Sequence, residues 1–357
     1  MVKINFVGDI MIGDSFHMLG IGTGSSIFTN GTNYIFEKVN TSLKQADLNV
    51  GNLECVFSNV TLKPKKNLKP YLTHSSNYVE SLKQARFNIL NMANNHTMQY
   101  GSDTFQFTEK ILIQNNIKVI GTIKNPYYMS DVDNIKFAFL GYSLRPNQFK
   151  YRDIQYIEGY KKKIIEDAKS LSRESDHVIV SLHWGDEYVS YPNQDQIDLA
   201  HEVIDAGATL IIGHHSHILQ GIEYYKNGAI AYSIGNFVFD KPQLLQRKSV
   251  ILQAALTKDC LRGITLIPIY INRKYQPEIA TGGKKENIEK IIWRANKKII
   301  TNYGKKRKYN RDIYIGSQYM RIQFYFYFLL NFYRYPPMTF LSLLLGAIKR
   351  IIFRRNT

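Results

Sequence analysis

The sequence predicts a layered α/β fold, and three observations support that prediction. Short apolar runs alternate with helix-like stretches from the first residues to about Lys258, as strands and helices do in such folds. Six of the runs lead abruptly into a polar segment containing Asp, Asn, Glu or His. The 357 residues are 44% hydrophobic, which excludes a disordered chain and suffices for one large domain with an appendage, or for two domains.

The six apolar runs are predicted to be buried strands, because each is short and continuously apolar. They cover Lys3–Val7, Asp47–Val50, Phe87–Met92, His177–Leu182, Ala208–Ile212 and Ala229–Ser233. A further strand is expected over Ile264–Ile271. Pro268 predicts that this strand lies at an edge, because proline cannot donate a hydrogen bond to a neighbouring strand.

Helices are predicted between the strands, where apolar residues recur at helical spacing. They cover Asn33–Gln45, Ser76–Gln84, Gly101–Asn115, Tyr156–Ser172 and Gln194–Ala206, and a charged helix is expected over Glu286–Ile300. The stretch before Gly207 shows the pattern well, because its apolar residues fall on one face and the glycine marks its end.

The strand ends carry the residue types that bind divalent metals. The candidates are Asp9, Glu54, Asn95, His96, His183, His215, His217 and Asn236. A buried strand gains nothing from an unpaired acid or imidazole at its end, and the carboxyl ends of strands in an open α/β sheet form a common crevice. Imidazole, carboxylate and amide donors without a thiolate cluster suit Mn, Fe or Zn alike. A simple turn remains an alternative for Asp9, and an equal one for Asn236 and Asp240.

Two of these segments give the strongest indication. His215 and His217 are alternate residues, and alternate residues of an extended segment face the same way, so both imidazoles can point into one site. Asn95 and His96 are adjacent, so an amide oxygen can bind metal while the neighbouring imidazole transfers protons.

The charge of the chain is concentrated near its end. The net charge is +17, but 14 of the 46 basic residues and only one acidic residue, Asp312, lie from Arg294 onward. The preceding part is therefore close to neutral. This distribution favours a tail that meets an anionic surface over a domain that binds nucleic acid, so no nucleic-acid partner is expected.

The tail contains two uncharged apolar pieces separated by Arg334. They cover Ile322–Tyr333 and Tyr335–Ile348, with 12 and 14 residues, and each is shorter than the roughly 20 residues of a simple transmembrane helix. We expect a hairpin in the membrane interface, with Lys349, Arg350, Arg354 and Arg355 against anionic lipid. The alternative is a segment that packs on the body or on a partner subunit. The expected division is a domain over 1–290, a basic linker over 291–320 and a membrane-interacting tail over 321–357.

Three smaller features complete the expectations. Cys55 and Cys260 lie outside any CxxC pattern and are expected to be free thiols, with a single disulfide as the alternative. Residues Lys63–Lys69 form a basic loop, either a solvated turn or a rim that attracts an acidic substrate. The first strand follows Met1 without a secretory signal, so a membrane-associated body on the cytoplasmic face is expected.

Six segments together resemble a known family. In order they are VGDIMIGD, GNLE, NMANNH, HWGDEY, GHHSHILQ and YSIGNFVFD, and they are similar to the motifs of the CapA family of poly-γ-glutamate capsule-synthesis proteins, which is related to the calcineurin-like metallophosphoesterases. The resemblance covers Lys3 to about Glu289. It implies a four-layer α-β-β-α sandwich of two mixed sheets with a metal centre at the strand ends, and a role in making, exporting or anchoring a γ-linked polyglutamate capsule.

The resemblance also implies roles for single residues. Its metal ligands correspond to Asp9, Glu54, Asn95, His183, His215 and His217, its proton donor to His96, and the candidate substrate-binding residues are Asn52, Asn94 and Asn236. Two positions depart from the phosphoesterase pattern. Met11 stands where an imidazole is usual, and Asn52 with Glu54 stands where a bridging Asp is expected, so the centre holds one or two ions and Asp14 is a candidate replacement ligand. Members commonly carry an N-terminal hydrophobic anchor, so here the tail is expected to provide membrane attachment.

Three functions are compatible with these features. The first is a metal-dependent hydrolase or transferase acting on a phosphorylated or polyanionic capsule substrate. The second is a non-catalytic assembly factor that holds the anionic polymer or its precursor beside a capsule synthetase complex. The third is a nuclease, which the near-neutral body disfavours.

Overall fold

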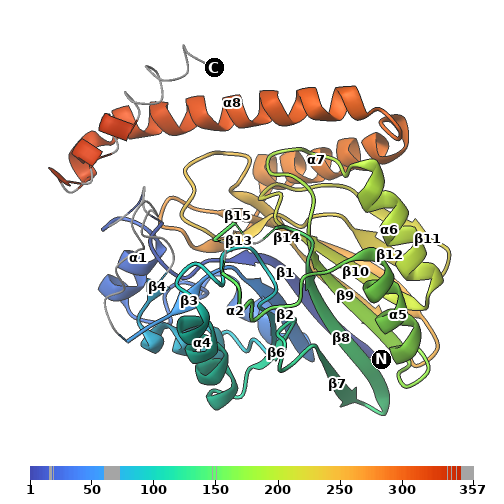
Figure 1. Ribbon diagram of the computed structural model, residues 1–357. Coiled ribbons are helices and arrows are strands. Elements are labelled where there is room, and N and C mark those ends of the chain that lie inside the picture. Colours follow the sequence, from blue (N-terminus) through green and yellow to red (C-terminus); the bar gives the residue numbers. More distant parts are fainter. Residues whose placement is uncertain are drawn as a thin grey trace.

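The computed structural model consists of two mixed β-sheets packed face to face, with helices on the outer face of each (Figure 1). It describes residues 1–15, 18, 20–59, 73–146, 148–149, 151–335, 337–338, 340–342 and 344–346. The arrangement confirms the predicted four-layer α/β sandwich.

The first sheet has the strand order β16-β15-β14-β1-β2-β5-β6, and β13 also pairs with β1. Its strands are β1 (Val2–Ile10), β2 (Leu48–Leu53), β5 (Ile89–Asn91), β6 (Lys118–Ile120), β13 (Asn236–Val238), β14 (Lys248–Leu256), β15 (Leu261–Ile271) and β16 (Pro277–Ile279). β1 is parallel to β2 and β13 and antiparallel to β14. The carboxyl ends of β1, β2 and β13 therefore lie on the same side of the sheet as the amino end of β14.

The second sheet has the strand order β11-β12-β10-β9-β8-β7. Its strands are β7 (Tyr127–Val132), β8 (Ile135–Ser143), β9 (His177–His183), β10 (Ala208–His214), β11 (Ile222–Tyr225) and β12 (Gly228–Ala231). The four central strands run parallel, and β7 and β11 pair antiparallel at the two edges. A separate short ladder joins β3 (Val56–Phe57) to β4 (Thr73–His74).

Strand alternation divides the core into three apolar layers. The layer between the sheets contains Ile4 and Phe6 of β1 with Phe137 and Phe139 of β8. Successive side chains of a strand point to opposite faces, so Val7 belongs instead to the layer under the helices of the first sheet. The third layer lies between the second sheet and its own two helices.

The predicted helices are present with two differences, and a further helix over Thr23–Asn30, before the first predicted one, was not predicted. They are α1 (Thr23–Asn30), α2 (Asn40–Lys44), η2 (Ser76–Tyr78), α3 (Val79–Gln84), α4 (Ser102–Gln114), α5 (Lys161–Leu171), α6 (Gln194–Asp205) and α7 (Gly282–Thr301). The helix predicted over Asn33–Gln45 is reduced to α2, because residues 31–39 form successive turns that bury their apolar side chains without a regular helix. The helix predicted from Tyr156 begins only at Lys161, because Tyr156 and Glu158 form bridges with strand-like segments.

The position of Pro268 differs from the prediction. It faces Val250 of β14 on one side, and β16 pairs with Ile269–Ile271 just beyond it. β15 is therefore not the outermost strand, and the edge prediction was wrong. The proline is tolerated because β16 is short and its register begins after the residue that lacks an N–H.

The C-terminal region is largely helical. α8 (Lys306–Leu330) is followed by η3 (Phe332–Arg334), so residues 291–320, expected as a linker, lie mainly in α7 and α8. α8 crosses one end of the molecule above the sheets (Figure 1). Beyond it the chain turns back, since the ring of Phe340 stacks on that of Phe328 with centroids 5.2 Å apart. Among the described residues no helix combines the length and apolar character needed to cross a bilayer.

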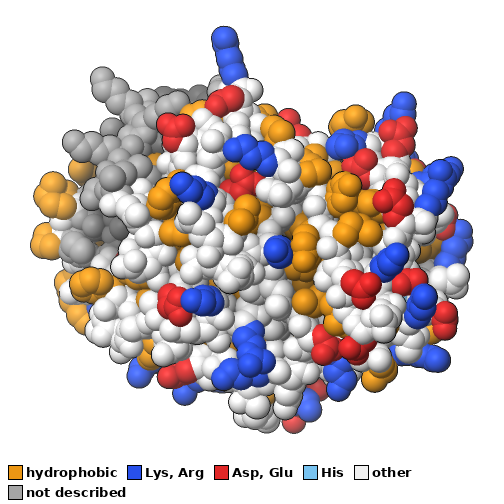
Figure 2. All heavy atoms as spheres, turned by 90° about the horizontal axis from the view of Figure 1, so that it is seen from below, with side chains coloured by type: hydrophobic (Ala, Val, Ile, Leu, Met, Phe, Trp, Pro, Cys, Tyr) orange, Lys and Arg blue, Asp and Glu red, His pale blue; other side chains and the backbone are white. Residues whose placement is uncertain are grey.

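Several expectations concern single positions. Cys55 and Cys260 are free thiols, as predicted. The basic loop Lys63–Lys69 and the four basic residues from Lys349 onward lie outside the described residues. On the face seen in Figure 2, basic and acidic side chains are interspersed, in agreement with a near-neutral body.

Candidate metal centre

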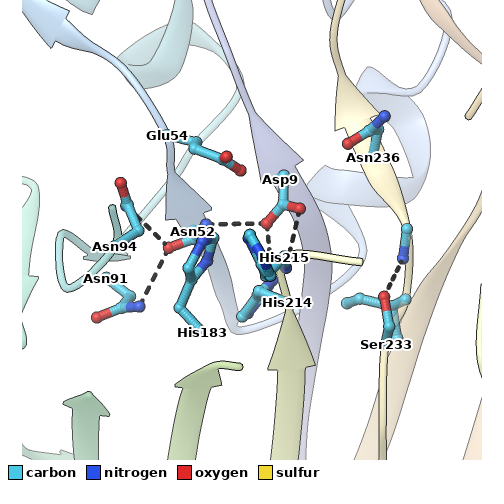
Figure 3. Close-up of polar contacts among 12 residues, drawn as sticks. Asp9, Asn52, Glu54, Asn91, Asn94, His183, His214, His215, Ser233 and Asn236 are labelled. Atoms are coloured by element: carbon cyan, nitrogen blue, oxygen red, sulfur yellow. Dashed lines mark hydrogen bonds and ion pairs between the residues drawn. The ribbon is translucent and has the colours of Figure 1, made fainter. Parts of the chain in front are cut away.

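Strand register brings the predicted ligands together. In the first sheet Asp9 of β1 lies between Asn236 of β13 and Asn52 of β2. In the second sheet His183 of β9 lies beside His214 of β10. Because these strands end at the same side of both sheets, two rows of polar side chains from separate sheets face one another (Figure 3).

The two carboxylates at the centre have different surroundings. Asp9 Oδ1 accepts a hydrogen bond from Asn52 Nδ2 at 2.8 Å, and Asp9 Oδ2 accepts one from the His215 backbone N–H at 3.3 Å. Glu54 is fully buried, and in the described part of the chain neither of its oxygens has a hydrogen-bond partner. Its Oε1 lies 3.7 Å from Nε2 of both His96 and His217. Glu54 is therefore a buried acid that lacks compensation from hydrogen-bond donors.

Besides His96, four imidazoles surround these acids. His183 Nε2 and Asn95 Oδ1 are 2.8 Å apart, and the His183 and His215 ring centroids are 4.8 Å apart. His217 Nδ1 lies 2.9 Å from Asn236 Oδ1 and 3.5 Å from Asp9 Oδ2. His214 Nδ1 lies 3.2 Å from Asp9 Oδ1. Both ring nitrogens of His215 are buried, and no described residue hydrogen-bonds to them.

The local backbone of the HHSH segment differs from the prediction. The segment is not extended, because β10 ends at His214 and both His215 and His217 have positive φ, 87° and 58°. Such values are uncommon for residues with a side chain and often occur at functional sites. The two rings still face one region, with centroids 6.1 Å apart. The prediction that they converge is correct, but the strand alternation offered as its reason was wrong.

The electrostatics of the centre favour a bound cation. Burial, followed by the charges of Asp9 and Glu187, raises the pKa of Glu54 well above its usual value. Burial and the neighbouring His215 and His214 rings lower the pKa of His183 well below its usual value. Burial would raise the pKa of Asp9, but the His214 and His217 rings hold it below its usual value. His183 is thus neutral, which is the state in which an imidazole binds metal.

These residues fit a divalent metal ion. Asp9, Glu54 and His183 each offer a ligand atom, and these atoms lie within 4.8 Å of one another. A buried carboxylate without donors and an imidazole with two unpartnered nitrogens are costly in a folded protein unless a cation satisfies them. Oxygen and nitrogen donors without thiolates suit Mn, Fe or Zn.

The two departures from the phosphoesterase pattern have structural consequences. Met11 is fully buried in the core layer beneath the helices of the first sheet, so it does not contribute to the centre. Asp14 does not replace it, because its two oxygens accept hydrogen bonds from the backbone N–H groups of Ser25 and Gly20, both at 2.9 Å. Asp14 instead fixes the loop before α1.

The three asparagines predicted to bind substrate are fully buried and hydrogen-bonded within the protein. Asn52 Oδ1 accepts from Asn91 Nδ2 at 3.1 Å and from Asn94 Nδ2 at 3.2 Å, while its Nδ2 donates to Asp9. Asn94 Oδ1 accepts from the His96 backbone N–H at 3.2 Å. Asn236 contacts His217 through Oδ1 and donates to the Gln246 carbonyl at 3.1 Å. Their side chains therefore position the acids and imidazoles around them.

His96 is the most accessible of the imidazoles at the centre. Its side chain is 21% exposed, compared with 4% for His217. Burial and the neighbouring His217 lower the pKa of His96 to about 4. An imidazole with this pKa is mainly neutral at pH 7, so it would take up a proton readily only beside an added anion.

Some residues at the centre were not predicted to act there. Glu187, in the loop after β9, has its pKa lowered to about 2: burial would raise it, but the His217 and His215 imidazoles outweigh that effect. Its place four residues after His183 was the available signal. His214 was not predicted to be a ligand, although it contacts Asp9. Asn91, at the end of β5, was not identified either.

The family model of "Bacterial capsule synthesis protein PGA_cap" matches residues 3–241. The chain is 31% identical over 304 residues to the capsule biosynthesis protein CapA of Bacillus anthracis, covering 80% of this chain and 71% of that protein. It is 30% identical over 284 residues to the PGA biosynthesis protein CapA of Bacillus subtilis, covering 76% and 72%. The calcineurin-like phosphoesterase YfkN from Bacillus subtilis superposes with a TM-score of 0.45 at 12% identity, covering 83% of this chain and 96% of that one.

These matches define the class of protein. The chain belongs to the PGA_cap family of bacterial capsule synthesis proteins.

Proposed function

We propose that this chain is a metal-dependent, hydrolase-like component of capsule synthesis that acts on a phosphorylated or polyanionic capsule substrate. The observation that carries the proposal is that, among the described residues, the buried Glu54 oxygens and the buried His215 nitrogens have no hydrogen-bond partner, and that they lie beside Asp9 and His183. Such a donor set is stable when a cation occupies it and costly when none does. Membership of a capsule synthesis family supplies the substrate class.

The proposed ligands are Asp9, Glu54, Asn95, His183, His215 and His217, with one or two Mn, Fe or Zn ions. A cation held there supplies Lewis acidity, polarising the substrate and activating water. Asn52 and Asn236 hold the Asp9 and His217 side chains in place. His96 is the proposed proton donor to the leaving group, because it is the imidazole that solvent and substrate can reach and it has Glu54 beside it.

Metal analysis of two variants tests these assignments. His215→Ala removes a proposed ligand and should reduce the bound metal of the purified protein. His96→Ala should retain the metal and lose hydrolysis of a generic phosphodiester in added Mn²⁺, by a factor on the order of 10²–10⁴ if general-acid catalysis is its role. Loss of metal from His96→Ala, or full metal content in His215→Ala, would show that the roles are wrongly assigned.

A second candidate function is a non-catalytic assembly factor that holds polyglutamate or its precursor beside a capsule synthetase complex. The position of Met11 favours it, because methionine stands where the phosphoesterase pattern has an imidazole and the candidate replacement, Asp14, is bound instead to the backbone N–H groups of Ser25 and Gly20. Tightly bound metal without turnover of the phosphodiester, together with binding of an anionic polymer, would select this function over the first.

We also propose that the tail attaches the protein to anionic membrane. α8 buries Met320 and Phe328 against the rest of the protein and leaves Ile322, Phe326 and Leu329 about two-thirds exposed. An exposed apolar face next to excess basic charge is typical of interfacial helices. Cosedimentation of the full chain with phosphatidylserine vesicles should fall when Phe326, Leu329 and Leu330 become Ser. It should not fall for Phe28→Ser, which removes an even more exposed apolar side chain on α1.

The domain over 1–290 remains the proposed unit that carries the centre, and nucleic acid is not a proposed partner. Interspersed charges on the face in Figure 2 support that view. The test is a variant in which the basic residues from Lys305 onward are replaced by neutral ones. If this variant still bound DNA, with an affinity that fell steeply as salt rose, the proposal would be contradicted.

A further inference from the structure

A cavity of about 380 Å³ lies between α8 and the segment that follows β13. The segment contributes Asp240, Lys241 and Gln243, and α8 contributes Ser317 and Arg321, along with other residues of both elements. α8 lies outside the residues matched by the family model, 3–241. The cavity therefore forms where the capsule-synthesis domain meets an additional helix.

Specific contacts fix α8 over this cavity. Tyr309 Oη donates to Asp186 Oδ2 at 3.1 Å, and Tyr191 Oη donates to Asp312 Oδ2 at 2.8 Å. Gln243 Nε2 donates to the Met320 carbonyl at 3.3 Å. At Gly316 an added Cβ would lie 2.6 Å from the Tyr188 carbonyl oxygen, so the helix touches the loop backbone. α8 thus docks on the same loop that carries Glu187 to the metal centre.

The cavity adjoins the metal centre through two aromatic rings. Lys241 Nζ lies 5.2 Å from the Phe239 ring centroid, and that ring is 5.0 Å from the His217 ring. The Tyr188 ring, which lines the cavity, is 6.4 Å from the His217 ring. The cavity therefore lies next to the metal centre, separated from the proposed ligand His217 by the Phe239 and Tyr188 rings.

The side chains around the cavity offer two kinds of recognition. Lys241 and Arg321 are cations, and within the described residues neither forms an ion pair with a carboxylate. Gln243 Oε1 and Asp240 Oδ1 are buried oxygens for which the described chain provides no hydrogen-bond donor. Burial raises the pKa of Asp240 to about 7, so at neutral pH it opposes the two cations only in part. A ligand that fits this cavity therefore brings an anion for the two cations and an N–H or O–H donor for the two buried oxygens.

We propose that this cavity is a subsite for a chain that bears carboxylates along an amide-linked backbone. Lys241 and Arg321 bind the carboxylates of this ligand, and the side-chain oxygen Oε1 of Gln243 accepts a hydrogen bond from one of its amide N–H groups. These contacts position the ligand beside the metal centre. A phosphodiester would satisfy the cations and leave the buried acceptor without a donor, because it has no O–H or N–H group. The proposal rests on the proposed function, since it takes the chain that reaches the metal centre to be its substrate.

Binding of a fluorescent γ-linked decaglutamate to the full chain tests the subsite, with inorganic phosphate as the competitor. Lys241→Gln and Arg321→Gln should each weaken binding at least tenfold at fixed salt. Arg307→Gln is the matched control, because it removes the same charge from an exposed position of α8 that does not line the cavity, and it should change binding less than twofold. Ser317→Trp, which fills the cavity from the helix side, should abolish binding while the circular dichroism spectrum is retained.

The outcomes separate this proposal from the proposed hydrolase function. Equal losses in Arg307→Gln and Arg321→Gln would indicate nonspecific attraction and overturn the subsite, as would unchanged binding in Ser317→Trp. If inorganic phosphate displaced the fluorescent decaglutamate at the same concentration as unlabelled decaglutamate does, a carboxylate-bearing polymer would be ruled out as the specific ligand. If the purified protein binds none of the tested metals but still binds decaglutamate in a way that depends on Lys241 and Arg321, the subsite is supported and the metal-dependent hydrolase is not.

Discussion

Replacing Glu54 by Gln should give a protein whose stability relative to the wild type depends on whether metal is present. Gln has nearly the same shape but no charge, and Glu54 is fully buried without hydrogen-bond donors to its oxygens. In chelator, the variant should be at least as stable as the wild type at pH 8, because it removes a carboxylate that burial and neighbouring Asp9 disfavour. With metal present, the variant lacks a ligand and should be the less stable protein.

The size of the effect follows from ligand linkage. At a Mn²⁺ concentration of about 100 times Kd, the wild type gains about 2.7 kcal/mol of stability. If the variant binds about 100-fold more weakly, its gain at the same concentration is about 0.4 kcal/mol. The difference, about 2.3 kcal/mol, corresponds to several degrees in Tm for a chain of this size.

Thermal unfolding followed by circular dichroism, with and without Mn²⁺ or Zn²⁺, measures these gains. Glu174→Gln is the control, because Glu174 is exposed. The same metal-dependent rise in Tm for Glu54→Gln and the wild type would refute the assignment of Glu54. No rise in the wild type with any of the metals would refute the metal centre itself.

Three further predictions concern other residues. Cys260 should react with a thiol reagent in the native protein, whereas Cys55 should react only after unfolding. The reason is that Cys55 is fully buried and burial raises the pKa of its thiol to about 12. Rapid reaction of both thiols in the native protein would contradict this. Asp240 has a folded pKa of about 7 against an ordinary value of 3.8, so its contribution to stability is complete below pH 3.8 and is lost as pH rises through 7. The free energy of unfolding should fall over that range by at most about 4 kcal/mol more in the wild type than in Asp240→Asn, and equal slopes in urea titrations would be evidence against the shift. Gly8→Ala should lower the free energy of unfolding by about 1–3 kcal/mol or more, since its Cβ would lie 1.9 Å from the Gly235 carbonyl oxygen; a denaturation midpoint like that of the wild type would contradict the close packing of β1 on β13.

Local patterns were sufficient for much of the fold. A strand buried on both faces must be continuously apolar, and therefore β1, β9 and β10 could be located from composition alone. The β7–β8 hairpin and β14 were not predicted, because they end in no ligand-type residue and their apolar pattern resembles that of a buried helix segment.

The candidate centre was predictable in membership but not in the role of each member. His183 and His215 are recognisable because an imidazole at the end of an apolar run needs a partner. Asn52 hydrogen-bonds to Asp9, and Asn236 lies within hydrogen-bonding distance of His217. These contacts depend on the register between strands, which no local pattern specifies.

By itself the sequence determined which residues are apolar, at what spacing, and which polar types follow each run, and these predict much of the secondary structure and the donor chemistry. Only the tertiary structure decided that two sheets place their strand ends opposite one another, that Met11 packs into the core while Glu187 joins the centre, and that α8 folds back over Lys241. The physical reason is that contacts between residues far apart in the chain depend on the packing of whole layers, whereas propensity and periodicity act over a few neighbouring residues.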